Sequence, residues 1–227
     1  MNKKNYLLDL NNSKKPFIIY KSDKGFDLYT DFSKKIILNN NNIEKFINKN
    51  NRLKLPYKET DLFIGFFGYE ILNNLIDVKI KKQKTINFPK GIFYKPETKI
   101  KLPNNLEYKK TRSLNSNDLF KININKKSYK VIFDKFKKKI KSGETYQIKI
   151  CTKYSNKSEI DALDFFSRLV KSNMAPEAFM IKDKNYSIIS CSPENLITKK
   201  NNFITTKPIA GTLKKTKKLN KNKALTF

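Results

Sequence analysis

Three short segments in the second half of the chain carry side chains that could take part in chemistry. They are TYQIKI at Thr145–Ile150, ISCSPENL at Ile189–Leu196 and TKPIAGT at Thr206–Thr212. In the second segment, the carboxyl group of Glu194 is a group that could donate or accept a proton. The alternative is structural: a glutamate that opens a turn after Pro193 and caps nearby backbone amides.

The other two segments could bind a substrate. Because Gly211 has no side chain, backbone amides near it could approach a carboxylate, and the Thr212 hydroxyl could add one directed hydrogen bond. An ordinary Gly-Thr turn between strands would contain the same two residues. The amide of Gln147 does not titrate near neutral pH and therefore cannot act as a base. Gln147 could equally be a polar residue on the open face of a strand.

Several kinds of chemistry lack their usual residues. The chain has no histidine, which is the commonest general base and transition-metal ligand. Its two cysteines, Cys151 and Cys191, do not have the paired spacing of a zinc site. We expect both to be small core residues in a reducing cytoplasm, because Met1–Asn12 is not an apolar signal segment. No apolar run approaches the roughly twenty residues that span a bilayer, so we expect no membrane partner.

The net charge is +29, from 49 lysines and arginines against 20 acidic residues in 227. Such an excess usually indicates nucleic acid or an anionic membrane as partner. Here the lysines are spread over the whole length, and only Arg52, Arg112 and Arg168 are arginines, the residue that base readout favours. A drift towards AT-rich codons explains the same composition, so we do not expect a nucleic-acid partner. A non-enzymatic basic module that binds nucleic acid or anionic surfaces is the alternative.

The hydrophobic pattern predicts the elements that hold these segments. Apolar residues at every third or fourth position predict a helix over Tyr129–Ile140, with Gly143 as its C-terminal cap. Alternation over Tyr146–Tyr154 predicts a strand with two chemically different faces. Ser158 and Asp161 resemble a capping box for a second helix, which runs through residue 170. Three more strands are expected at Ala178–Ile181, Tyr186–Cys191 and Phe203–Thr206.

The first half consists of short apolar runs between polar turns. A strongly apolar strand is predicted at Asp61–Tyr69, where Gly65 and Gly68 indicate close backbone approach or a bulge. The other predicted elements are strands at Phe17–Tyr20, Phe26–Tyr29, Lys35–Leu38 and Gly91–Tyr94, a hairpin turn at Asp23–Gly25, and helices at Ile43–Asn50 and Glu70–Ile76. The order of helices and antiparallel strands predicts the α+β class.

Taken together, the three segments occur in the order and spacing of the chorismate-binding enzymes, and GFFGYE at Gly65–Glu70 resembles their N-terminal region. The chain resembles the N-terminal portion of component I of anthranilate synthase or aminodeoxychorismate (para-aminobenzoate) synthase. The resemblance implies the component I-like fold, with antiparallel sheets and flanking helices. Residues 1–110 would form its N-terminal region and residues 111–227 an incomplete first half of the chorismate-binding domain.

The resemblance also implies roles for single residues. Glu194 corresponds to the general acid that protonates the 4-hydroxyl of chorismate as it leaves. Gly211 and Thr212 correspond to the loop that contacts the substrate. Where the water-using branches carry a lysine, this chain has Gln147, as the amine-using branches do. The implied nucleophile is ammonia, delivered by a glutamine amidotransferase subunit.

The branch of the family is less sharply indicated. Some aminodeoxychorismate synthases carry a lysine at the position of Ala210 that adds covalently to the ring, whereas anthranilate synthases carry alanine. Ala210 therefore favours the anthranilate branch, or an aminodeoxychorismate synthase that dispenses with the covalent step. Two features favour the aminodeoxychorismate branch: the short N-terminal region, and the sequence FIIYKS at Phe17–Ser22 in place of the Leu-Leu-Glu-Ser of the tryptophan-feedback pocket. On balance we expect the aminodeoxychorismate branch slightly more than the anthranilate branch.

Complete members of the family continue past this point and supply glutamates that hold Mg²⁺, a histidine and basic residues that bind substrate. None of these can be placed in Leu213–Phe227. We therefore expect a C-terminally truncated fold that is unstable and inactive alone, with the Mg²⁺ ligands absent from this chain. Three origins would explain such a truncation: a split gene, a pseudogene or an incomplete gene model. In the first case, the separately encoded C-terminal half would be a partner.

Overall fold

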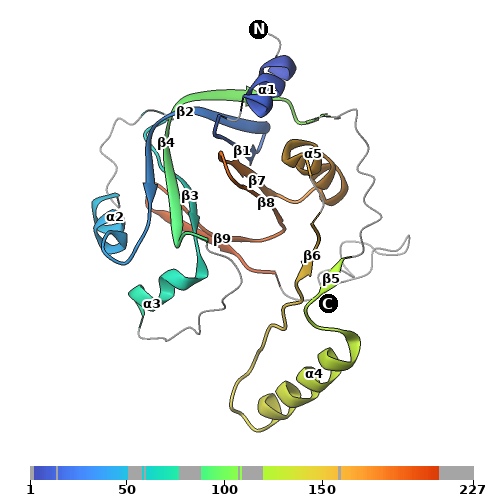
Figure 1. Cartoon of the computed structure of the whole chain (residues 1–227). Coiled ribbons are helices and arrows are strands. Elements are labelled where there is room, and N and C mark those ends of the chain that lie inside the picture. The colour runs from blue at the N-terminus through green and yellow to red at the C-terminus, as the bar shows by residue number, and fades with distance from the viewer. Residues whose placement is uncertain are drawn as a thin grey trace, which may run out of the picture. The chain divides into compact units, whose positions relative to one another are not determined.

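The computed structural model describes residues 3–13, 15–50, 58, 60–76, 88–106, 108, 120–157 and 160–209 (Figure 1). Two compact units are formed, the first from Met1–Tyr108 and Ala162–Phe227 and the second from Lys109–Asp161. Helices are mixed with antiparallel strands, so the predicted α+β class is confirmed. The assignment of residues 1–110 to an N-terminal component I-like region, and of residues 111–227 to an incomplete first half of the chorismate-binding domain, stays a prediction.

A six-stranded antiparallel sheet forms the centre of the first unit, in the order β3-β4-β2-β1-β7-β8. Its strands are β1 Phe17–Ser22, β2 Gly25–Ile37, β3 Ile64–Phe67, β4 Gly91–Leu102, β7 Glu177–Lys182 and β8 Ser187–Ser192. The predicted hairpin turn at Asp23–Gly25 joins β1 to β2 and is confirmed. The run Lys35–Leu38 was predicted as a separate strand, but β2 continues into it as far as Ile37. The register of β2 against β4 shifts after Phe32, and the two strands remain paired on both sides of this shift.

Close backbone approach at Gly65 is confirmed by the pairing of β3 with β4. A Cβ atom at Gly65 would lie 1.9 Å from the carbonyl oxygen of Ile92, so no larger residue fits there without movement of the backbone. Gly65 stands opposite Phe93 in the register of the two strands. Glycine at this position therefore allows the short strand β3 to join the edge of the sheet.

Core clusters lie on both faces of the sheet, in agreement with the apolar run that begins β1. On β1, Phe17 and Ile19 belong to one cluster of the core and Ile18 to another. Two helices, α1 Lys3–Asn12 and α5 Ala162–Asn173, cover the face of Phe17 and Ile19 (Figure 1). Helix α1 was not predicted, because its polar and mixed sequence has only a weak periodic pattern.

Smaller helices pack against β2 and β4 through a third core cluster. The helix predicted at Ile43–Asn50 is confirmed with the same bounds as α2. The helix predicted at Glu70–Ile76 is a 3-10 turn, η1 Tyr69–Ile71, followed by α3 Leu72–Leu75. Ile43 and Ile71 share a small core cluster with Leu38 and Phe93, which holds these helices to β2 and β4.

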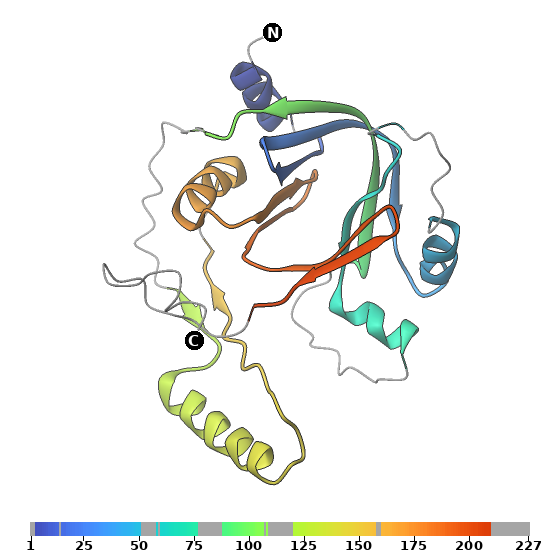
Figure 2. The same ribbon diagram turned by 180° about the vertical axis from the view of Figure 1, so that it is seen from behind.

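The second unit contains helix α4 Lys126–Lys141 and the two-residue strands β5 Lys121–Ile122 and β6 Tyr154–Ser155 (Figure 2). The predicted helix is confirmed, with Asn125 as N-cap. Gly143 follows the helix with φ of 75°. The strand predicted over Tyr146–Tyr154 is wrong, because residues 144–153 form no regular element. Alternation becomes a strand only where a partner supplies hydrogen bonds, and in the described part of this unit such pairing begins at Tyr154.

The last elements belong to the first unit. The helix predicted through residue 170 is confirmed as α5, while Ser158 of its predicted capping box lies outside the described residues. Strands β7 and β8 confirm two more predictions, and the predicted strand at Phe203–Thr206 is β10 Phe203–Lys207. It pairs with β9 Asn195–Lys200, which was not predicted. Within the described parts of the chain, every helix is too short or too polar to cross a membrane.

Candidate active site

Glu194 lies in the short connection between β8 and β9, at the exposed end of the central sheet. Ser192 organises this turn with its hydroxyl group. The Oγ atom accepts a hydrogen bond from the Glu194 backbone N–H at 3.2 Å and donates one to the Glu194 carbonyl oxygen at 2.9 Å. Proline at position 193 fixes one backbone torsion of the same turn. The Ser-Pro-Glu sequence therefore forms a local structure that presents the Glu194 side chain to solvent.

The structure brings the acid segment and the start of the proposed substrate loop together. Glu194 Oε1 accepts a hydrogen bond from the backbone N–H of Ile209 at 3.3 Å. The hairpin formed by β9 and β10 causes this meeting, because Asn195 stands opposite Lys207 in its register. Thr206 Oγ1 also donates to the carbonyl oxygen of Leu196 at 2.8 Å. Ala210, Gly211 and Thr212, the predicted substrate-loop residues, lie outside the described residues.

Three side chains that were not predicted support the turn. Tyr20 donates its hydroxyl to Glu177 Oε2 at 2.6 Å, and Asn195 Nδ2 donates to Glu177 Oε1 at 3.1 Å. Burial, followed by the hydrogen bond to Glu177, raises the pKa of Tyr20 above its ordinary value. Sequence pattern could not find this group, since Tyr20 and Glu177 are 157 positions apart and no motif joins them.

The predicted site residue Gln147 lies in the second unit. It is exposed and belongs to no regular element, and its carbonyl oxygen accepts a hydrogen bond from Thr145 Oγ1 at 3.2 Å. Since the strand predicted around it does not form, Gln147 is not on the open face of a strand. Gln147 and Glu194 belong to different compact units, so the role of Gln147 beside a substrate stays a prediction.

The two cysteines differ in their surroundings. Cys191 is half-buried and packs against the larger core cluster, and burial raises the pKa of its thiol. The expectation of a core position is met there only in part. For Cys151 it is wrong, because this cysteine is exposed in the stretch where the predicted strand is missing.

No group of three or more metal-ligating side chains comes together among the residues that the structure describes. Among these residues, no cluster of carboxylates marks a place for Mg²⁺, a cation that prefers oxygen ligands.

A polar cluster on the central sheet is a second group of titratable side chains. Asp183 accepts hydrogen bonds from Lys35 Nζ at 2.5 Å, from the Tyr94 hydroxyl and from the Lys184 backbone N–H at 2.6 Å. The hydroxyls of Tyr94 and Tyr186 lie 2.9 Å apart. Burial alone would raise the pKa of Asp183, but these donors outweigh it and hold the pKa below its ordinary value. The cluster is internally satisfied and serves to stabilise the sheet.

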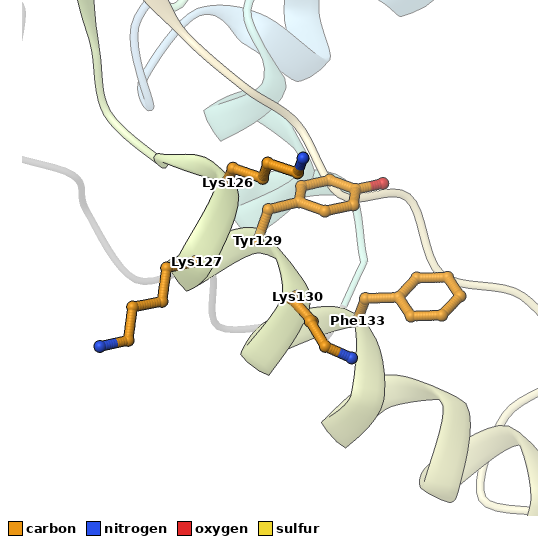
Figure 3. A pocket seen from close by; sticks show the side chains of 5 residues that line it. All are labelled: Lys126, Lys127, Tyr129, Lys130 and Phe133. Atoms are coloured by element: carbon orange, nitrogen blue, oxygen red, sulfur yellow. The ribbon is translucent and has the colours of Figure 1, made fainter.

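A hollow on the surface of α4 is a third possibility (Figure 3). Tyr129 and Phe133 stack with ring centroids 6.5 Å apart, and Lys126 and Lys130 complete the lining, whereas Lys127 points away from the two rings. All five side chains are exposed and come from one helix. The lining contains no carboxyl group and none of the predicted site residues, so the turn at Glu194 is the candidate active site.

Comparison with known proteins shows the family of the chain. The family model of chorismate binding enzymes matches residues 3–226, nearly the whole chain. The anthranilate synthase component I-like protein of Synechocystis sp. is 23% identical over 188 residues, which cover 72% of this chain and 39% of that protein. Aminodeoxychorismate synthase component 1 of Salmonella typhimurium is 36% identical over 72 residues, or 32% of this chain and 16% of that protein.

Anthranilate synthase component 1 of Buchnera aphidicola is 32% identical over 118 residues, which cover 51% of this chain and 22% of that protein. The chain thus spans well under half the length of these relatives. An aminodeoxychorismate synthase component 1 and an anthranilate synthase component 1 match at similar identity, so the comparisons do not separate the two branches. Since the family model matches residues 3–226, the chain belongs to the chorismate-binding enzyme family.

Proposed function

We propose that this chain contributes the acid and the substrate loop of a component I-type synthase that aminates chorismate with ammonia and releases the 4-hydroxyl. The observation that carries the proposal is the hydrogen bond between Glu194 and Ile209, which joins the Ser-Pro-Glu turn to the residue directly before Ala210. We further propose the anthranilate synthase component I-like fold for the complete protein.

The geometry at Glu194 suits a proton donor. Hydroxide is a poor leaving group, so a carboxylic acid held at the departing oxygen lowers the barrier. The Ile209 N–H contacts Oε1 and leaves Oε2 to carry the proton to the leaving hydroxyl. The capping role considered from the sequence is therefore compatible with catalysis, since it orients the carboxyl group and uses a single oxygen.

Gln147 is proposed to lie beside the nucleophile. Its amide cannot remove a proton from water, which favours ammonia as the attacking species. A glutamine amidotransferase subunit is the proposed source of ammonia. Mg²⁺ is the cofactor that the family resemblance implies, and no cluster of three or more metal-ligating side chains marks its place among the described residues.

The branch is proposed to be aminodeoxychorismate synthase, with anthranilate synthase as the alternative. The FIIYKS sequence at Phe17–Ser22 supports the aminodeoxychorismate branch, whereas Ala210 supports the anthranilate branch. Product analysis separates the two. The favoured branch forms aminodeoxychorismate, which a lyase converts to para-aminobenzoate, whereas the alternative forms anthranilate directly.

The test measures loss of chorismate with an ammonium salt and Mg²⁺, using this chain co-expressed with any downstream reading frame that encodes the glutamates of complete family members. We expect ammonia-dependent turnover that falls at least about a hundredfold in Glu194→Gln, because general acid catalysis typically contributes that much. Glu97→Gln, at an exposed position on β4, is the matched control and should retain activity. Undiminished turnover by Glu194→Gln would rule out the proposed acid.

A further inference from the structure

A line of three hydrogen-bonded side chains runs from the central sheet to the turn that carries Glu194. Its middle member is Glu177, which uses one carboxylate oxygen for Tyr20 and the other for Asn195. Tyr20 belongs to β1 of the central sheet, and Asn195 directly follows Glu194 in the chain. The line therefore ends at the residue next to the proposed acid.

Strand register places Glu177 between its two partners. Its Cα partner on β8 is Ser192, the first residue of the Ser-Pro-Glu turn. On the other side, Tyr20 stands opposite Phe179, so its hydroxyl reaches Glu177 along the diagonal between neighbouring strands. Glu177 is half-buried at the first residue of β7, where the well-packed part of the sheet ends. Its position is thus fixed by the sheet rather than by the turn.

Glu194 needs this support because its own side chain is exposed. The N–H···O distance of 3.3 Å to Ile209 is long for a hydrogen bond of this type. An exposed glutamate samples several rotamers unless its backbone is held in one conformation. Asn195 is the residue that can hold it, since it directly follows Glu194, pairs with Lys207 and donates a hydrogen bond to Glu177.

We propose that Glu177 is a positioning residue, which through Asn195 fixes the turn that aims the Glu194 carboxyl group at the Ile209 N–H. This inference rests on the proposed role of Glu194 as the acid. The effect of Glu177 on the position of the Glu194 side chain can be measured without any enzyme turnover.

The measurement follows the amide proton of Ile209 by nuclear magnetic resonance in the folded full chain. An N–H that donates to a carboxylate changes its resonance when the carboxylate is protonated. We expect a pH-dependent change at Ile209 that disappears in Glu194→Gln. In Glu177→Ala the change should shrink at least about twofold, because the turn samples more conformations.

Two conservative variants distinguish positioning from general loosening of the hairpin. Glu177→Gln keeps an acceptor for Asn195 and a donor that can face the Tyr20 oxygen, so the Ile209 response should survive. Thr198→Val removes a different hydrogen bond to the same Asn195 side chain and should also leave the response intact. A loss in Thr198→Val as large as in Glu177→Ala would overturn the proposal.

Asn195→Ala is the second variant if Glu177→Ala does not fold. It breaks the line at its last member and should reduce the Ile209 response equally. A full response in folded Asn195→Ala would overturn the positioning role. In the chorismate assay, Glu177→Ala should lower kcat about tenfold with a smaller change in KM, since a misaimed acid affects the chemical step.

The two proposals fail in different ways. If Glu194→Gln retains full turnover, the proposed function is wrong, while the Ile209 measurements still report whether Glu177 holds the turn. If the Ile209 response is complete without Glu177, the positioning role is wrong, while the activity of Glu194 is still measured by turnover.

Discussion

The carboxylate of Glu194 accepts a hydrogen bond from the backbone N–H of Ile209, fifteen positions further along the chain, at 3.3 Å. Between them the chain forms the hairpin of β9 and β10, so both residues are at its open end. This contact converts two separate sequence segments into one local site. It also makes the site depend on the turn at Ser192 and on the hairpin register.

Removing the Ser192 hydroxyl should weaken the turn. Ser192→Ala loses one accepted and one donated hydrogen bond. We expect the free energy of unfolding to fall by about 1 kcal/mol, a typical net value for such a contact. Urea unfolding with an unchanged m value would measure it. Ser187→Ala, at the exposed first residue of β8, is the control, and an equal effect of both substitutions would contradict the assignment.

Replacing Asp183 should destabilise the central sheet at neutral pH. Its carboxylate accepts hydrogen bonds from Lys35 and Tyr94, and Asp183 is 8% exposed. Asp183→Asn should lower the free energy of unfolding by about 2 kcal/mol, as expected for hydrogen bonds to a charged group. Asp134→Asn, which breaks an exposed ion pair with Lys130 on α4, should cost less than about 0.5 kcal/mol.

The effect of Asp183 should depend on pH in a defined direction. Because the pKa of Asp183 is lowered from its ordinary 3.8, the folded state favours the charged form. This stabilisation is present above about pH 4 and is lost as the pH falls through the folded pKa. Denaturant titrations at several acidic pH values should show the unfolding curves of native chain and Asp183→Asn converging. A constant difference down to low pH would contradict this.

The tyrosines of the first unit predict a loss of stability at alkaline pH. Burial raises the pKa of Tyr186 to about 12 and raises the pKa of Tyr94 and Tyr20 as well. The folded state therefore favours the neutral phenols, and this stabilisation, present below pH 10, is lost as the pH rises above that value. Tyrosinate absorbance in the folded chain should show late-titrating groups that disappear in Tyr94→Phe and Tyr186→Phe. Tyr146→Phe, at a side chain 91% exposed, is the control and should leave them in place.

Two glycines should tolerate alanine very differently. Gly65→Ala puts a Cβ atom 1.9 Å from the Ile92 carbonyl oxygen, which requires the paired strands to separate. We expect a loss of about 3 kcal/mol in the free energy of unfolding. Gly143→Ala meets no atom within 4 Å and carries only the strain of its positive φ, about 1 kcal/mol. Thermal unfolding of both variants would test the order, and a larger loss at Gly143 would contradict it.

The charge of +29 allows a direct test of the alternative function. We expect only weak binding of random-sequence DNA at physiological salt, with no base preference. Titration at increasing salt concentration would measure it, since phosphate contacts give a steep salt dependence. Nanomolar affinity at physiological salt would favour the basic-module alternative over the enzyme.

The fold was predicted most accurately where local pattern and burial agree. Helix α2 and strands β7, β8 and β10 have an apolar period or run bounded by polar residues, and their limits follow from it. The stretch around Gln147 shows the opposite case. Its alternating pattern satisfies the local criterion for a strand, but a strand also needs a partner for its backbone hydrogen bonds. Sequence pattern does not contain that information.

By itself, the sequence determined the α+β class and the family resemblance, since residue type and local spacing are enough for these. The choice of Glu194 as candidate acid followed from that resemblance. Only the tertiary structure decided that Ile209 contacts Glu194 and that Tyr20, Glu177 and Asn195 form one hydrogen-bonded line. The physical reason is that strand pairing joins residues distant in sequence, and its register sets which side chains can reach one another.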